Sequence, residues 1–423
     1  MNNWENMSKD ELLSLKEAYC KEFEEFKQKG LKLDMSRGKP SPDVLDLSNE
    51  LIDLPDAWKS NDGTDCRNYG VLNGLAECRQ IFSDLLGIPA DQIIVGNNAS
   101  LELMYSAYMR LYMFGTLGGK PWKAYDRVKF LCPSPGYDRH FAINKAFGTE
   151  MVIIPMTEDG PDMDMVERLV KEDPAVKGIW CVPLYSNPQG VIYSDETVKR
   201  LAVMDTAAAD FRVFWDNAYG VHHVYDDHAV ANILDPAREA GKEDRIYYFF
   251  STSKITFPGA GISMMASSPA NIAEQLKHLS LQTIGPDKMN QLRAAQFLKS
   301  ADHILDHMAK IKTILRPKFD VVLGTLEREL GGAGIVSYIK PKGGYFVAID
   351  TMEGCAKAVV AMAKEGGVVL TGAGATYPNG FDPKDTNIRI APTYPSLDEL
   401  TKAMELLCIC IKRVSLDKLL AES

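Results

Sequence analysis

The chain has 423 residues, 46% hydrophobic and 25% charged, which is the composition of an ordinary globular enzyme with room for two lobes. Its 47 basic and 57 acidic residues give a formal net charge of -10, which argues against a nucleic-acid partner. No apolar run approaches the ~18–20 residues of a membrane span, and the polar stretch at residues 1–6 lacks the hydrophobic segment of a secretory signal. The eight cysteines form no Cys-x-x-Cys pair, which favours reduced thiols in the cytoplasm over a disulfide framework or a metal site.

The first predicted element is a helix that begins at the capping-box pattern of residues 8–11 and stops near Gly30. A proline-rich loop follows at residues 35–42. From about residue 65 to residue 270, strand-like and helix-like segments alternate, and several strands are nearly continuous apolar runs, as expected when both faces of a sheet are covered. The predicted strands are 92–95, 128–132, 150–154, 176–182, 211–215, 245–250 and 262–266, and the predicted helices are 74–86, 100–113, 162–171 and 195–208.

The pattern changes at about residue 286 to long helices over 289–330, followed by short strands near 335–349 and 386–391. This change indicates a second, smaller α+β lobe. We therefore expect a mostly parallel, seven-stranded sheet with helices on both faces, and a smaller domain beside it. The expected boundaries are an N-terminal segment that joins the small domain at 1–55, a large domain at 56–295 and a small C-terminal domain at 296–423.

Lys254 is the most informative single residue. It follows the apolar run 246–250 and the hydroxyl side chains of Ser251, Thr252 and Ser253, so it stands where a buried strand ends. A buried ammonium group is costly. The position therefore favours a lysine of lowered pKa that forms a Schiff base, with the hydroxyl groups beside it binding an anion.

Three other polar motifs also end or interrupt strand-like segments: residues 187–190, residues 216–220 and the segment around Arg389. In open α/β sheets, ligands bind outside the carboxyl ends of the strands. We therefore expect these motifs and Lys254 to meet at one site. The turn at 96–100, between a strand and a helix, would add an anion site of backbone N–H groups, although a simple helix cap is the alternative explanation.

The order Asn-Pro-x-Gly, Asp-x-Ala-Tyr, Ser-x-Ser-Lys and a late Arg makes the chain resemble the pyridoxal-phosphate (PLP) aminotransferases of fold type I. The resemblance runs from roughly residue 30 to the C-terminus. Within the family, the chain resembles a divergent aspartate aminotransferase subgroup that is related to aminotransferase-like bacterial regulators. The resemblance implies a homodimer with shared active sites that moves an amino group between an amino acid and a 2-oxo acid in a ping-pong reaction.

The resemblance also implies roles for individual residues. Lys254 would carry PLP and act as general acid and base, and Asp216 would keep the pyridine nitrogen protonated. Tyr219 and Asn187 would hydrogen-bond the phenolic oxygen of the cofactor, and Arg389, with Asn187 close by, would bind the substrate α-carboxylate. The other implied cofactor contacts are the ring-stacking Tyr137, the phosphate-binding Asn97, Asn98, Ala99, Ser100, Ser251 and Ser253, and Tyr69 from the partner subunit.

One position departs from the family pattern at the phosphate. Gly261 stands where relatives commonly carry a phosphate-binding arginine, seven residues after the Schiff-base lysine. We expect Thr256, Lys288 or groups of a neighbouring subunit to compensate.

The substrate expected from the resemblance is a dicarboxylic amino acid, aspartate above all, with 2-oxoglutarate as acceptor. Well-studied aspartate enzymes take the arginine for the distal carboxylate from a segment that matches 281–286, and no arginine is present there. Arg37 and Lys39 flank Gly38, which relatives lay along the substrate, and either side chain is a candidate for that carboxylate. A solvated basic loop is the alternative explanation of both.

Two other functions stay open at this point. A β-lyase or decarboxylase would use the same fold and the same lysine. A non-catalytic PLP-binding effector module of a regulator is less favoured, because only about thirty residues precede the matching region and the chain is acidic.

Overall fold

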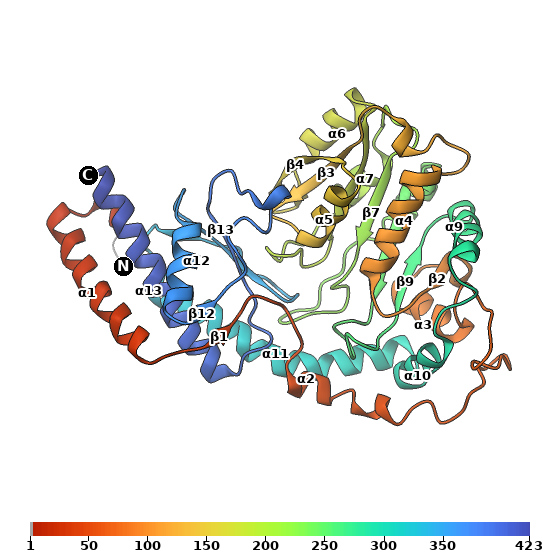
Figure 1. Cartoon of the computed structure of the whole chain (residues 1–423), viewed down its shortest axis with the longest axis horizontal. Helices are drawn as coiled ribbons and strands as arrows, with labels where there is room; N and C mark the ends of the chain where they lie inside the picture. The colour runs from red at the N-terminus through yellow and green to blue at the C-terminus, as the bar shows by residue number, and fades with distance from the viewer. Residues whose placement is uncertain (1–2) are drawn as a thin grey trace.

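The computed structural model describes residues 3–423, so the first two residues of the polar N-terminal stretch lie outside the description. The molecule has two lobes, and one helix runs from the larger to the smaller (Figure 1). No helix within residues 3–423 is long and apolar enough to cross a membrane.

The large lobe is built on a mixed, mostly parallel sheet in the order β2-β9-β8-β7-β6-β3-β4-β5. The five central strands β8, β7, β6, β3 and β4 run parallel, whereas β9 is antiparallel to both of its neighbours. All seven predicted strands are present, and the two-residue β5, antiparallel to β4, makes the eighth. The bounds are β2 (Ile93–Val95), β3 (Lys129–Ser134), β4 (Glu150–Thr157), β5 (Gly160–Pro161), β6 (Val176–Cys181), β7 (Arg212–Asp216), β8 (Ile246–Ser251) and β9 (Ser263–Ala266).

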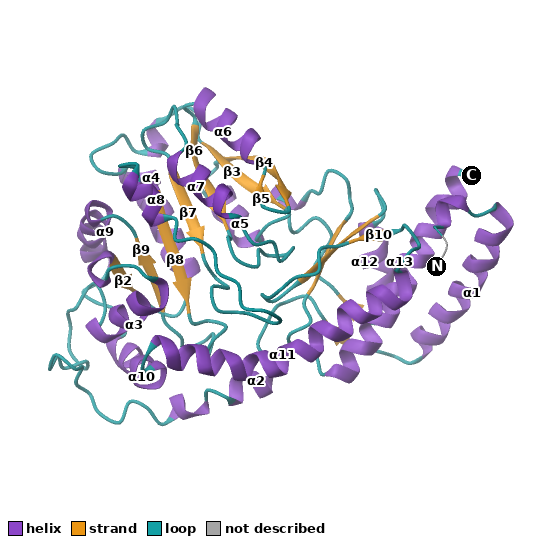
Figure 2. Cartoon of the chain, turned by 180° about the vertical axis from the view of Figure 1, so that it is seen from behind, coloured by secondary structure: helices purple, strands orange, loops and turns teal. Residues whose placement is uncertain are grey.

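Helices cover both faces of this sheet, as the sequence predicts (Figure 2). In β7, Val213 and Trp215 point into one apolar cluster and Phe214 into the other, so both faces are buried. Double burial explains why the strand sequences are apolar throughout rather than alternating. The helices are α3 (Ala76–Leu86), α4 (Ser100–Phe114), α5 (Asp138–Ala146), α6 (Met163–Glu172), α7 (Asp195–Val203), α8 (Leu234–Glu239), α9 (Pro269–Gln282) and α10 (Lys288–Leu298).

The small lobe combines an antiparallel sheet, β10-β11-β13, with helices and a short parallel pair, β1 and β12. Ser8 caps the N-terminal helix α1: its hydroxyl and its backbone N–H both bond Glu11, as in a capping box. The helix packs on α13 of the same lobe (Figure 1). The bounds are α1 (Lys9–Gln28), β1 (Leu33–Asp34), α11 (Ala301–Leu330), β10 (Val336–Ser337), β11 (Val347–Thr351), α12 (Ala356–Glu365), β12 (Val368–Val369), β13 (Asn387–Ile390) and α13 (Leu397–Glu422). The short helix α2 (Pro42–Asp46) lies against α11, and its Val44 belongs to an apolar cluster of the large lobe.

Helix α11 runs from one lobe to the other, and the two lobes therefore share one continuous helix just after the predicted boundary. The domain boundary at residue 295 stays a prediction. The strand ends that matter for chemistry lie in the middle of the large sheet. Because β6, β7 and β8 are adjacent and parallel, the segments that follow them leave the sheet at the same edge. That edge faces the small lobe.

Candidate functional site

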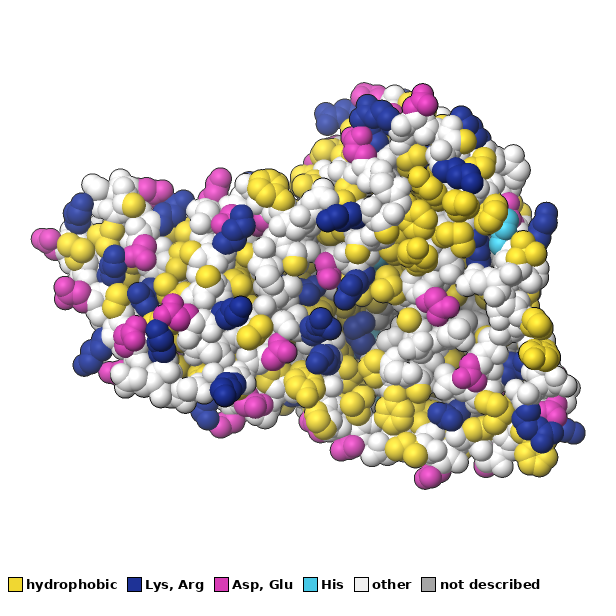
Figure 3. Space-filling view, in the orientation of Figure 1, with side chains coloured by type: hydrophobic (Ala, Val, Ile, Leu, Met, Phe, Trp, Pro, Cys, Tyr) yellow, Lys and Arg dark blue, Asp and Glu magenta, His cyan; other side chains and the backbone are white. Residues whose placement is uncertain are grey.

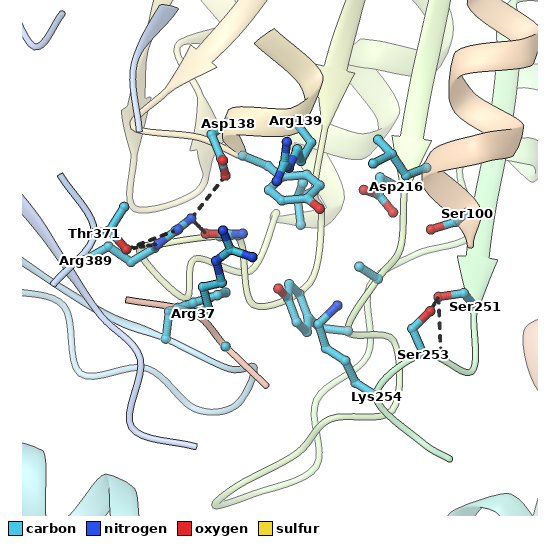
Figure 4. A pocket seen from close by; sticks show the side chains of 18 of the residues that line it. Arg37, Ser100, Asp138, Arg139, Asp216, Ser251, Ser253, Lys254, Thr371 and Arg389 are labelled. Carbon is cyan, nitrogen blue, oxygen red and sulfur yellow. Dashed lines mark hydrogen bonds and ion pairs between the residues drawn. The ribbon is translucent and has the colours of Figure 1, made fainter. Parts of the chain in front are cut away.

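A cavity of about 570 Å³ lies at this edge, between the carboxyl ends of β7 and β8, the starts of α4 and α5, and strand β13 of the small lobe (Figure 4). Most of the residues that the sequence predicts for the site come together here. The predicted residues that line the cavity are Arg37, Gly38, Ala99, Ser100, Tyr137, Asn187, Asp216, Tyr219, Ser251, Ser253, Lys254 and Arg389.

Three predicted cofactor residues do not line this cavity. The Asn98 amide donates a hydrogen bond to the Pro258 carbonyl at 3.1 Å, and Asn97 lines a separate cavity of about 260 Å³. The side chain of Tyr69 is on the surface, with 80% of its area exposed. Within one protomer, the turn before α4 therefore contributes Ala99 and Ser100 to the cavity.

The two residues expected to replace the missing arginine at Gly261 are engaged elsewhere. Lys288 donates to the Gly70 carbonyl at 3.0 Å, and the Thr256 hydroxyl lies 3.4 Å from the Thr252 carbonyl; neither lines the cavity. A Cβ atom at position 261 would lie 2.7 Å from the Thr252 hydroxyl oxygen. Local packing thus explains why this position has no side chain.

Lys254 lies in the turn that follows β8, with its Nζ 5.0 Å from the centre of the Tyr219 ring. Burial lowers the pKa of Lys254, and the negative charge of Asp216 partly opposes that shift. Losing its proton, and so reaching the form that attacks a carbonyl, is therefore easier for this amine than for an exposed lysine.

His222 supports the turn that carries Lys254. Its Nε2 lies 3.2 Å from the backbone carbonyl oxygen of Lys254, so this nitrogen donates the hydrogen bond. Burial, reinforced by the charge of Lys254, lowers the pKa of His222 to about 3. The imidazole is thus neutral at physiological pH, and its Nδ1 has no hydrogen-bond partner within residues 3–423.

Asp216 ends β7 and is 2% exposed. One carboxylate oxygen, Oδ2, is 3.0 Å from Nε2 of His140, whose ring stacks on Trp180. The other oxygen, Oδ1, is buried without a hydrogen-bond partner in the described part of the chain. A buried carboxylate oxygen with no partner is expensive, so the site fits a ligand that brings a donor, such as a protonated pyridine nitrogen.

One end of the cavity is suited to a phosphate. Helix α4 begins after Ala99, and no side chain caps its first N–H groups. The hydroxyls of Ser100, Ser251 and Ser253 lie at this end (Figure 4), where the Ser251 hydroxyl donates to Ser253 at 3.0 Å. Free helix N–H groups together with hydroxyl donors form a binding site for an anion.

Arg389 lies at the opposite end of the cavity, on β13 (Figure 4). It is 7% exposed, and its guanidinium is oriented by Thr371 at 3.2 Å, Asn187 at 3.3 Å and Asp138 at 3.4 Å. Its planar group also stacks on the Phe346 ring, 4.8 Å from the ring centre. These contacts hold the Arg389 guanidinium in an orientation suited to binding the carboxylate of a ligand. In the present structure, Asp138 accepts a hydrogen bond from one of its N–H groups.

Sequence reasoning missed several lining or supporting residues, among them Asp138, Arg139, His140, Thr371, His222 and Phe346. Three of them directly follow Tyr137 and form the start of α5, a helix that the sequence pattern did not predict. Their position directly after Tyr137 could have indicated them, because a helix that begins at the cavity places its first residues beside the cavity.

Sequence comparison matches nearly the whole chain to known aminotransferases. A family described as aspartate amino-transferase matches residues 7–423. A putative aminotransferase from Mycolicibacterium smegmatis is 48% identical, over 99% of this chain and 100% of that protein. An aspartate aminotransferase from Corynebacterium glutamicum is 45% identical, over 92% of this chain and 91% of that protein.

Solved structures agree with the sequence matches. The crystal structure of an aspartate transaminase from Corynebacterium glutamicum has a TM-score of 0.96 at 43% identity and covers 99% of both chains. An α-aminoadipate aminotransferase from Thermus thermophilus, complexed with N-(5′-phosphopyridoxyl)-L-leucine, shares the fold with a TM-score of 0.75 at 20% identity, over 93% of this chain and 94% of that one.

Proposed function

The chain belongs to the aspartate amino-transferase family, and from that premise we propose that it binds PLP on Lys254 and transfers the amino group of aspartate to 2-oxoglutarate. The observation that carries the proposal is the order of groups along one cavity. Anion donors stand at one end, Lys254 and the half-satisfied Asp216 in the middle, and Arg389 at the other end (Figure 4).

The residues present fit PLP. The start of α4 with Ser251 and Ser253 would hold the phosphate, and Oδ1 of Asp216 would accept the hydrogen bond of the pyridine nitrogen. When bound, PLP supplies an electron sink for the electrons of a bond broken at the substrate Cα. His140 and its stack on Trp180 keep Asp216 in place for this task.

Proton transfer falls to Lys254. Because burial favours its uncharged form, the amine can take a proton from the substrate Cα and return it. Burial raises the pKa of Tyr219 well above its usual range, so its hydroxyl stays protonated and can donate a hydrogen bond. Arg389 would orient the substrate through its α-carboxylate, whose charge replaces that of Asp138 beside the guanidinium.

We also propose a homodimer in which Tyr69 reaches the phosphate of the partner subunit. Tyr69, Leu281 and Ile284 are all largely exposed, and the segments that carry them touch where Gly285 packs against Gly70. Further apolar side chains gather on the surface over α4 (Figure 3). An exposed apolar surface of this kind supports burial against a second copy. The eight free cysteines support a cytoplasmic location.

A half-reaction screen tests the proposed function. Holoenzyme is mixed with single amino acids, and loss of the visible absorbance of the bound cofactor is followed over time. We expect aspartate and glutamate to react fastest, and borohydride reduction before substrate addition to fix the pyridoxyl group on Lys254. An adduct on another lysine, or a faster reaction with a neutral amino acid, contradicts the corresponding part of the proposal.

A variant pair separates chemistry from general charge effects. Lys254→Ala removes the amine and should abolish turnover while the protein stays folded. Lys39→Ala removes a lysine from a loop beside the cavity without removing a lining side chain, and it should leave turnover near the native value.

A further inference from the structure

Two arginines line the cavity without an ion pair in the described part of the chain. Within residues 3–423, the guanidinium groups of Arg37 and Arg139 make neither a hydrogen bond nor an ion pair, in contrast to Arg389, which bonds Thr371, Asn187 and Asp138. Both side chains are exposed at the cavity rather than packed away. Guanidinium is the side-chain group best matched to a carboxylate, so two free ones at a cavity point to an anionic ligand.

The charges of the lining residues strengthen this point. Apart from Lys254, whose pKa is lowered by burial, the cationic side chains that line the cavity are Arg37, Arg139 and Arg389, whereas Asp138 and Asp216 are its only acidic lining residues. Asp216 bonds His140, and Asp138 lies 3.4 Å from Arg389. The positive charge left over is that of Arg37 and Arg139, and Lys and Arg side chains gather around the hollow between the lobes (Figure 3).

The two free arginines approach from different lobes. Arg139 belongs to the first turn of α5, directly after Tyr137 and Asp138. Arg37 follows Ser36, whose carbonyl accepts a 2.6 Å hydrogen bond from Thr371, the residue that also bonds Arg389. Thr371 thus links the backbone beside Arg37 to Arg389, whereas Arg139 belongs to a helix of the large lobe, and Figure 4 shows the two side chains directed toward the same part of the cavity.

We propose that Arg139 binds the distal carboxylate of a dicarboxylic substrate from the large-lobe side, opposite Arg37, and so determines the preference for dicarboxylic over neutral amino acids. This inference rests on the proposed transaminase function. A distal carboxylate buried without a cation would be strongly disfavoured, and the segment 281–286 provides none. A neutral side chain would offer this guanidinium no anion, whereas a distal carboxylate would pair with it, so the site would distinguish the two kinds of substrate.

The test compares Arg139→Gln with native holoenzyme and with Lys145→Gln. Glutamine keeps most of the side-chain length but removes the charge, and Lys145 is an exposed cation near the far end of the same helix that does not line the cavity. We expect kcat/KM for aspartate to fall on the order of 10- to 100-fold in Arg139→Gln, with little change for alanine. Lys145→Gln should leave both values unchanged. An equal loss on aspartate and alanine, or no loss on either, overturns the assignment.

An equilibrium measurement separates failure of this inference from failure of the proposed function. Calorimetry of the holoenzyme with succinate and with butyrate compares two acids of equal chain length that differ by one carboxylate. Native enzyme should bind succinate at least about 10-fold more tightly than butyrate, and Arg139→Gln should lose most of that difference. If native enzyme transaminates no amino acid, the proposed function fails, whereas succinate binding still reports on Arg139. If aspartate is a good donor and Arg139→Gln retains both its turnover and its succinate binding, only the inference fails.

Discussion

Replacing His222 by glutamine removes a buried group whose protonation opposes folding. Burial and the neighbouring Lys254 lower the pKa of His222 from 6.5 to about 3, whereas in the unfolded chain the ring regains its ordinary pKa. Between those two values the unfolded state binds a proton that the folded state does not. Native stability therefore falls as the pH drops below 6.5, and this contribution to the loss is complete near pH 3.

The size of the effect follows from the shift. Each pKa unit corresponds to about 1.4 kcal/mol, so the full loss is about 5 kcal/mol, and the part between pH 7 and pH 5 is about 2 kcal/mol. Glutamine at position 222 cannot titrate, yet its amide can still donate to the Lys254 carbonyl. The variant should therefore lose about 2 kcal/mol less stability than the native protein over this pH interval.

Urea unfolding of the full-length protein and the variant, at pH 7 and at pH 5, measures this difference directly. Other groups titrate over the same interval, but they are common to both proteins and cancel in the comparison. The native His222 ring resonance should also stay unchanged between pH 8 and pH 5 in nuclear magnetic resonance spectra. Equal acid sensitivity of the two proteins, or a ring that titrates near pH 6.5, would refute the assignment of a neutral buried imidazole.

Three further substitutions test the rest of the site. Gly261→Arg restores the side chain common in relatives and should destabilise the fold by about 1–3 kcal/mol, because its Cβ would press on the Thr252 hydroxyl. Thermal unfolding of the cofactor-free protein measures this loss, and an unchanged unfolding midpoint would speak against the close contact. Tyr69→Phe should weaken PLP binding about 10-fold without changing dimer affinity, as measured by equilibrium dialysis and analytical ultracentrifugation. Arg389→Lys should raise KM about 10- to 100-fold for every amino donor, neutral ones included, in steady-state assays; a loss confined to dicarboxylates would assign Arg389 to the wrong carboxylate.

The sequence by itself determined the order of the strands of the large sheet and most of the chemical groups of the site. Continuous apolar runs marked the doubly buried strands, and polar motifs at their ends marked one edge of the sheet. Since parallel neighbouring strands must leave the sheet at that edge, Lys254, Asp216 and the residues after β6 came together as predicted. Such inferences succeed because they depend only on strand direction and on the burial of whole segments.

Tertiary structure alone decided which side chain of each motif faces the ligand. Asn97 and Asn98 stand beside Ala99, yet they point elsewhere, and of the two basic residues flanking Gly38 only Arg37 lines the cavity. Helix α5, with Arg139, was not predicted because its sequence lacks a clear apolar pattern, and its place depends on the sheet beneath it. The same local sequence pattern is compatible with several directions for the side chains in a loop or in the first turn of a helix. They are selected by packing against segments far away in the chain, and only the folded structure reveals that selection.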